Sequence, residues 1–278
     1  MMKLAVTFIL ITALLTACGK NEHSMNHSGA KDSMAGMNHN NGHMDTAQEE
    51  SVEAVFTLSR DKPEPNQDTT ITVQIQAKDG KAIDDFDVKH EKKMHVIIVS
   101  KDLSYFNHIH PEYNGKNEFH ITTRFPTAGE FEIIADFAPT GIGSMSRSQW
   151  IKVNGNAPAA KPIEPDPTLT KVMNGKEVTL SFDHLMANME ITLNFNLKDA
   201  KTKEPITDLQ PYLGAVGHVV ILNQEGGEYL HVHPVEEKSS GPDAQFKTSF
   251  PHSGVYKIWG QFQQNGEVVT IPFVVHIP

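Results

Sequence analysis

Cysteine is almost absent from this sequence, which contains one, Cys18, among 278 residues. A single cysteine excludes an internal disulfide, a cysteine-ligated zinc site, an iron–sulfur cluster and a CxxC redox pair. If Cys18 is modified, as argued below, no thiolate remains, and a blue-copper electron-transfer site is excluded as well.

Basic clusters are also lacking, because 24 lysine and arginine residues face 34 aspartate and glutamate residues, a formal charge of −10. Binding to nucleic acid requires clustered Lys and Arg against the phosphates, so nucleic acid is not an expected partner. The sequence contains no GxSxG, HExxH or Gly-rich phosphate motif. We therefore do not expect an enzyme.

The first seventeen residues have the pattern of a bacterial lipoprotein signal peptide. Lys3 supplies a positive start, residues 4–15 are mostly apolar, and Leu15-Thr16-Ala17 precedes Cys18. As a helix, residues 4–17 would extend about 21 Å, short of the ~30 Å needed to cross a membrane. We expect cleavage after residue 17 and acylation of Cys18, which would anchor the protein in the lipid bilayer on the outer side of the cell membrane.

Residues 19–50 contain no Val, Ile, Leu, Phe, Tyr or Trp, so the segment 18–50 is expected to be a disordered tether. It is rich in imidazole and thioether groups, which are candidate metal ligands. These are His23, Met25, His27, Met34, Met37, His39, His43 and Met44. Imidazole suits Cu(II) and Zn(II), whereas thioether selects Cu(I), so the mixture favours copper. The alternative is a polar spacer with a biased composition.

From residue 51 onward the sequence predicts two all-β domains of about seven short strands each. Short apolar or alternating runs are separated by turn signals such as Asp79-Gly80 and Asn265-Gly266. This spacing is typical of an immunoglobulin-like β-sandwich. We place the first domain at residues 51–153, a proline-rich linker at 154–169 and the second domain at 170–278.

The two predicted domains share a histidine pattern, H-x12-H-x-H. It consists of His95, His108 and His110 in the first copy and of His218, His231 and His233 in the second. Residues two apart on a strand project from the same face, so the last two histidines of each set lie together. If Lys101-Asp102 closes a two-residue hairpin, His95 lies opposite His108, and Gln224-Glu225 would act in the same way in the second copy.

Three imidazoles on one face, without a thiolate, suit Cu(II) or Zn(II), and copper binds more tightly at equal availability. Because the ligands must be neutral, binding should weaken as the pH falls through about 6.5. The alternative is that these histidines occupy a polar sheet face or bond to nearby turns. Asp136 is the nearest acid or base for water activation, and its replacement by Gln261 in the second copy argues against catalysis.

Further His and Met residues near these strands could add ligands or be ordinary surface and core residues. They are His90, Met94, His120, His184, Met186 and Met189. His252 and His276 have no histidine at the matching position of the other copy, and we leave them out.

The H-x-H-P strand, the Phe-Pro…Gly turn and the segment MHVIIVSKDLSYFNHIHPE resemble YtkA-like domains, here in tandem over residues 51–278. The resemblance implies a compact immunoglobulin-like fold outside the cytoplasm, in a family linked with copper handling, and it brings no ligand set. The sequence thus predicts a membrane-anchored lipoprotein that sequesters copper, as Cu(II) or Cu(I), or passes it to a delivery or envelope protein; zinc is possible. The rival hypothesis is a non-metal envelope module whose histidines do not converge.

Overall fold

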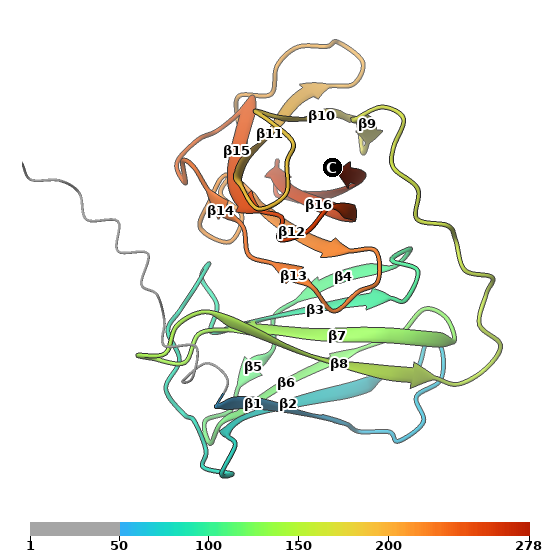
Figure 1. Ribbon diagram of the computed structural model, residues 1–278, viewed down its shortest axis with the longest axis vertical. Coiled ribbons are helices and arrows are strands. Elements are labelled where there is room, and N and C mark those ends of the chain that lie inside the picture. Colours follow the sequence, from blue (N-terminus) through green and yellow to red (C-terminus); the bar gives the residue numbers. More distant parts are fainter. Residues whose placement is uncertain (1–50) are drawn as a thin grey trace, which may run out of the picture. The chain divides into compact units, whose positions relative to one another are not determined.

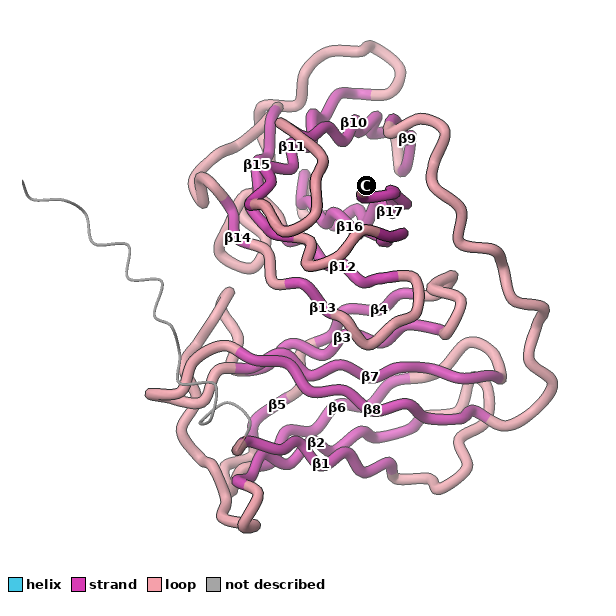
Figure 2. The backbone as a smooth tube through the Cα atoms, viewed as in Figure 1, coloured by secondary structure: helices cyan, strands magenta, loops and turns pink. Residues whose placement is uncertain are grey.

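A computed structural model describes residues 51–278 of the chain. The predicted signal peptide, Cys18 and the eight His and Met residues of the predicted tether lie outside these described residues, so those interpretations stay predictions. Residues 51–278 belong to one compact unit and form an all-β structure (Figures 1 and 2). Within them, no helix is long and apolar enough to cross a membrane.

The first repeat consists of two four-stranded sheets. Their strand orders are β1-β2-β6-β5 and β4-β3-β7-β8. The strands are β1 (Val52–Leu58), β2 (Thr69–Ala77), β3 (Met94–Ser100), β4 (Phe106–Ile109), β5 (Glu112–Tyr113), β6 (Glu118–Thr123), β7 (Gly129–Phe137) and β8 (Met145–Val153).

The second repeat pairs a five-stranded sheet, β14-β15-β11-β10-β9, with a four-stranded sheet, β13-β12-β16-β17. The strands are β9 (Thr170–Met173), β10 (Lys176–Phe182), β11 (Glu190–Asp199), β12 (His218–Asn223), β13 (Tyr229–Leu230), β14 (His233–Pro234), β15 (Asp243–Ser249), β16 (Gly254–Gln264) and β17 (Glu267–Ile277). The prediction of two tandem β-sandwiches is confirmed.

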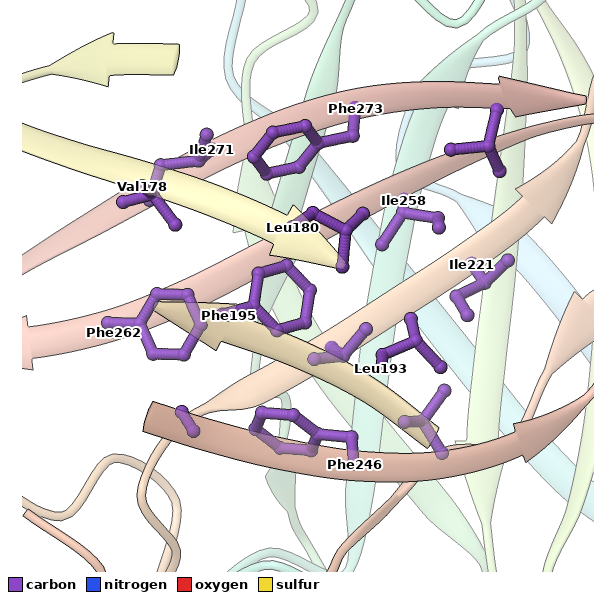
Figure 3. Packing of buried hydrophobic residues seen from close by; sticks show 14 of the residues in the cluster. Val178, Leu180, Leu193, Phe195, Ile221, Phe246, Ile258, Phe262, Ile271 and Phe273 are labelled. Carbon is purple, nitrogen blue, oxygen red and sulfur yellow. The ribbon is translucent and has the colours of Figure 1, made fainter. Parts of the chain in front are cut away.

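Each sandwich is held by the apolar faces of its two sheets. Along β11, buried residues alternate with partly buried ones, and along β15 they alternate with exposed ones, as expected for strands with one face in a core. Figure 3 shows Phe195 and Phe246 between the sheets of the second repeat, with Phe262 and Phe273 beside them. The Phe195 ring centre lies 5.3 Å from that of Phe262 and 5.8 Å from that of Phe246, which is favourable aromatic packing.

The two repeats pack against each other through β3 and β12, which are apolar on both faces. In β3, Val96 and Ile98 point into the core of the first repeat, whereas Ile97 and Val99 contact the second repeat. They meet a small apolar cluster to which β12 and β16 contribute Val220, Leu222 and Trp259. Figure 1 shows β3 and β4 of the first repeat next to β12 and β13 of the second. A strand buried on both faces explains the continuous apolar run of the sequence here.

Polar contacts at equivalent positions extend this inter-repeat face. Gly227 N donates a hydrogen bond to Glu132 Oε2 at 2.9 Å, and Lys257 Nζ donates one to the carbonyl of Leu103 at 2.7 Å. Glu132 on β7 and Lys257 on β16 are matching residues of the two copies, and each contacts the hairpin loop of the other copy. The contact between the repeats is therefore close to self-complementary, as in a twofold dimer.

Candidate metal centre

His95 lies on β3 on the face that is turned toward the second repeat, and it is only 3% exposed. β4 pairs with β3 so that His108 is opposite Ile97 and Ile109 is opposite Val96. Continuing this register puts His110 across from His95. The hairpin loop therefore has four residues, 101–104, and the predicted two-residue loop is wrong. Because the register shifts by two, every side chain keeps its face, and the three histidines still share one side of the sheet.

The three histidines of the first repeat bring one ring nitrogen each to a common point. His95 Nδ1 lies 3.0 Å from His108 Nε2 and 3.1 Å from His110 Nε2. Ligands about 2.0–2.1 Å from a tetrahedral ion are about 3.3 Å from one another, so an ion requires shifts of only a few tenths of an ångström. Among residues 51–278, this is the one group of three or more His, Cys, Asp or Glu residues whose candidate ligand atoms lie within 4.8 Å of each other.

Hydrogen bonds on the far side of two rings fix which nitrogen carries the proton. His95 Nε2 is 3.1 Å from the carbonyl oxygen of Lys89, which can only accept, so this nitrogen is the donor. His108 Nδ1 donates to Oε1 of Gln261 at 2.8 Å, with the amide in this orientation. When both rings are neutral, His95 Nδ1 and His108 Nε2 therefore present lone pairs to each other at 3.0 Å. Such a pair is repulsive unless both nitrogens share a cation.

The three rings remain neutral well below physiological pH. Burial is the main cause of the low pKa of His95, about 3, and the neighbouring His108 lowers it further. Burial likewise lowers the pKa of His108 and of His110 to about 4. A proton is therefore not the shared cation near neutral pH, and the nitrogens are in the form that binds metal.

The second repeat does not gather its three histidines into an equivalent group. In the first repeat, β4 stays paired with β3 up to Ile109, and the chain leaves this sheet only at His110-Pro111. In the second, β13 ends at Leu230. His233 then joins the other sheet on β14, opposite Lys247, and is exposed. His231 and His233 stay neighbours, with ring centres 4.6 Å apart, but they do not converge with His218.

His218 instead faces the site of the first repeat. Its ring stacks on those of His95 and His108, with centres 5.5 and 4.8 Å apart. His90, on the turn before β3, approaches the same place, its ring centre 5.4 Å from that of His218 and 6.4 Å from that of His231. The described part of the chain thus places seven imidazoles in a chain of ring contacts across the inter-repeat face. From sequence, His90 was named only as a possible additional ligand or a surface residue.

Asp136 and Gln261, which are matching residues of the two repeats, each reach a histidine of the other copy. Gln261 accepts from His108 as described, while Asp136 Oδ2 lies 4.0 Å from Nδ1 of His231 and accepts a hydrogen bond from Tyr229. Burial raises the pKa of Asp136 to about 6. The one sequence feature that points to these contacts between the repeats is the apolar run of β3. Such a run predicts that both faces of the strand are covered, but it does not identify the segment that covers the second face.

Most other candidates have ordinary structural roles. Met94 is a core residue, and His120 is bonded to Thr72 and Asn114 on the opposite sheet of the first repeat. His184 Nδ1 lies 3.1 Å from Oδ1 of the neighbouring Asp183. Met186 and Met189 are 54% and 48% exposed, away from any core.

One protein family matches both repeats. It is described as a domain of unknown function, DUF8832, and covers residues 49–153 and again residues 170–278. No curated protein matches the chain. The YtkA-like resemblance therefore stays a prediction.

Several solved structures are similar over most of the chain at low identity. The adhesin FdeC of Escherichia coli is 14% identical over 81% of the chain and 64% of its own length, with a TM-score of 0.28. A mutant Salmonella alpha-2-macroglobulin is 11% identical over 82% of the chain and 15% of its own length, with a TM-score of 0.30. The Yersinia pseudotuberculosis adhesin InvE is 9% identical over 80% and 58%, with a TM-score of 0.25. The chain spans less than two thirds of each, and similarity at this level carries no functional conclusion.

Proposed function

Because the chain belongs to the DUF8832 family through both repeats, and the family is described only as a domain of unknown function, we propose a function from the geometry of the site. The protein is a metal-binding protein that holds a copper ion at His95, His108 and His110. One observation carries this proposal: the carbonyl of Lys89 and the amide of Gln261 orient His95 and His108 so that their lone pairs face each other.

Copper is the proposed ion because the ligands are neutral imidazoles without a thiolate or a ligating carboxylate. Imidazole sites follow the Irving–Williams order, in which Cu(II) exceeds Zn(II), so zinc is the second choice. Three ligands leave coordination positions through which an ion can enter or leave. His110 directly follows β4 and is partly exposed, so the site is accessible to solvent on this side.

We propose binding rather than catalysis at this site. The buried carboxylate of Asp136, which pairs with His95 across β7 and β3, accepts a hydrogen bond from Tyr229 and lies 4.0 Å from Nδ1 of His231. We therefore assign this carboxylate to Tyr229 and His231 rather than to the activation of a metal-bound water. A protein that sequesters copper or passes it to another protein needs no such group.

The wider role rests on the sequence. An acylated Cys18 would anchor the protein to the outer side of the cell membrane, and the His- and Met-rich tether would capture the ion before the domains hold it. The rival hypothesis of a non-metal module expects histidines that point apart. The ring centres of the three ligands are 4.8–5.2 Å from one another, which supports the metal hypothesis.

Copper titration of the full chain, with the eight tether His and Met residues replaced by serine, tests the proposal. The His110→Ala variant removes a ligand that is only partly buried, and His276→Ala, an exposed histidine on β17, is the matched control. We expect His110→Ala to weaken the tightest Cu(II) binding by at least tenfold and the control to leave it unchanged. Equal affinity in both variants would remove this site from the account.

A further inference from the structure

His218 carries a buried polar atom that the fold leaves unsatisfied. It is 7% exposed, and its Nε2 atom has no hydrogen-bond partner among the described residues. A buried polar atom without a partner costs about 1–3 kcal/mol, so its persistence calls for an explanation. The aromatic rings in contact with His218 among the described residues are the imidazoles of His95, His108 and His90, with centres 5.5, 4.8 and 5.4 Å away.

His90 lies near both His218 and His231, which do not themselves converge in the described structure. Two imidazoles bound to the same ion at ~2.0–2.1 Å have ring centres roughly 5–6 Å apart. The separation is 5.4 Å between His90 and His218 and 6.4 Å between His90 and His231. The separation between His90 and His218 lies within this range, whereas His231 would have to move toward the other two rings to share an ion with them. His90 lies on a turn and His231 lies between two short strands, so neither residue is part of a regular strand.

The near-twofold relation of the repeats supplies an independent argument. The matching residues Gln261 and Asp136 lie beside the matching histidines His108 and His231. A carboxylate next to a ligating histidine orients the ring and raises its affinity for metal. Asp136 also brings a negative charge close to a place where a second cation would sit, which offsets the repulsion between two neighbouring ions.

We propose that His90, His218 and His231 hold a second ion beside the first, with Asp136 as the carboxylate that orients His231. In this site, two of the three histidines of the second repeat, His218 and His231, act as ligands, and His90 of the first repeat takes the place of His233. This inference rests on the proposed function only in that the two sites take the same metal. Since the ligands of the second site must move to converge, the second ion binds more weakly than the first.

The test is equilibrium dialysis against Cu(II), with metal analysis, in the full chain whose tether donors are serine. We expect two bound ions per chain, and one in His90→Asn and in His231→Ala. Asn is chosen because residue 90 has a φ of 47°, a conformation that asparagine tolerates. His233→Ala is the matched control, an exposed neighbour of His231 that should keep both ions. Thermal unfolding of each metal-free variant verifies that it is folded.

The outcomes separate the two proposals. One ion in the parent chain, lost in His110→Ala but kept in His90→Asn, overturns the second site and leaves the first. Loss of an ion in His233→Ala but not in His90→Asn also overturns it. No bound ion in the parent chain overturns both. As a further readout, two Cu(II) ions in adjacent sites should give a dipolar-coupled electron paramagnetic resonance spectrum, and His90→Asn should restore that of an isolated ion.

Discussion

The hydrogen bond from His108 to Gln261 makes a sharp prediction, because it joins the metal site of one repeat to a side chain of the other. Gln261 is 5% exposed, and its Oε1 atom accepts from His108 Nδ1 at 2.8 Å. Gln261→Leu removes the acceptor while roughly keeping the side-chain volume. His108 can then rotate or change tautomer, and its Nε2 atom no longer has to present a lone pair to His95. Loss of such an outer contact typically lowers metal affinity 10–100-fold, or about 1.4–2.8 kcal/mol.

Competition titration with a Cu(II) chelator measures this change in the full chain with serine in place of the tether donors. Gln263→Leu, two residues further along β16, is the matched control and should bind like the parent. Gln261→Glu keeps an acceptor at the same place and should restore most of the affinity. If Gln261→Leu binds Cu(II) as tightly as the parent, the second repeat does not orient His108 and the reasoning fails.

Four more predictions concern the pH dependence of binding and of stability, the packing of the repeats and stabilisation by bound metal. Burial lowers the pKa of His95 to about 3 and that of His108 to about 4. In competition titrations, the Cu(II) affinity of the first site should therefore change little between pH 7.5 and pH 5 and should fall only below about pH 4. The sequence alone led us to expect this fall near pH 6.5. In the unfolded chain His95 takes up a proton near pH 6.5, so acidification to pH 5 should lower the free energy of unfolding of the metal-free protein by about 2 kcal/mol through this residue. In urea unfolding, His95→Asn should lose about 2 kcal/mol less than the parent between pH 7.5 and pH 5. An equal loss in both proteins would contradict the low pKa of His95. Trp259→Ala, which removes a 3% exposed ring stacked 4.7 Å from Phe106, should cost about 3–5 kcal/mol in urea unfolding, and a cost under 1 kcal/mol would mean that the repeats do not pack as described. Saturating Cu(II), at about 1,000 times its Kd, should stabilise the chain by about 4 kcal/mol and raise the melting temperature. A melting temperature that is the same with and without Cu(II) would argue against specific sites.

Local pattern was sufficient to predict the strands and the shared face of the first three histidines. The run from Met94 to Val99 and the strand that contains His108 follow from period-two reasoning, and the four-residue loop altered the register without changing the face. An odd shift would have separated His95 from its partners. The prediction therefore depended on the parity of the hairpin register, which the actual loop length preserved.

Contacts between the repeats could not be predicted in this way. Both copies read His-x-His-Pro, yet β13 ends at Leu230 and β4 continues to Ile109, and nothing in the matching sequences marks this difference. The positions of His90, Gln261 and His218 around the first site depend on how two folded sandwiches pack, which strand periodicity does not encode. The apolar run in β3 is typical of a strand with two covered faces, but the partner on the second face is known only from the packing of β3 against β12.

An anomalous difference map from crystals grown with Cu(II) would test the central claim most directly. We predict a strong copper peak about 2.0–2.1 Å from His95 Nδ1, His108 Nε2 and His110 Nε2, with Gln261 still hydrogen-bonded to His108. Crystals saturated with copper that show no peak among these three nitrogens would contradict it.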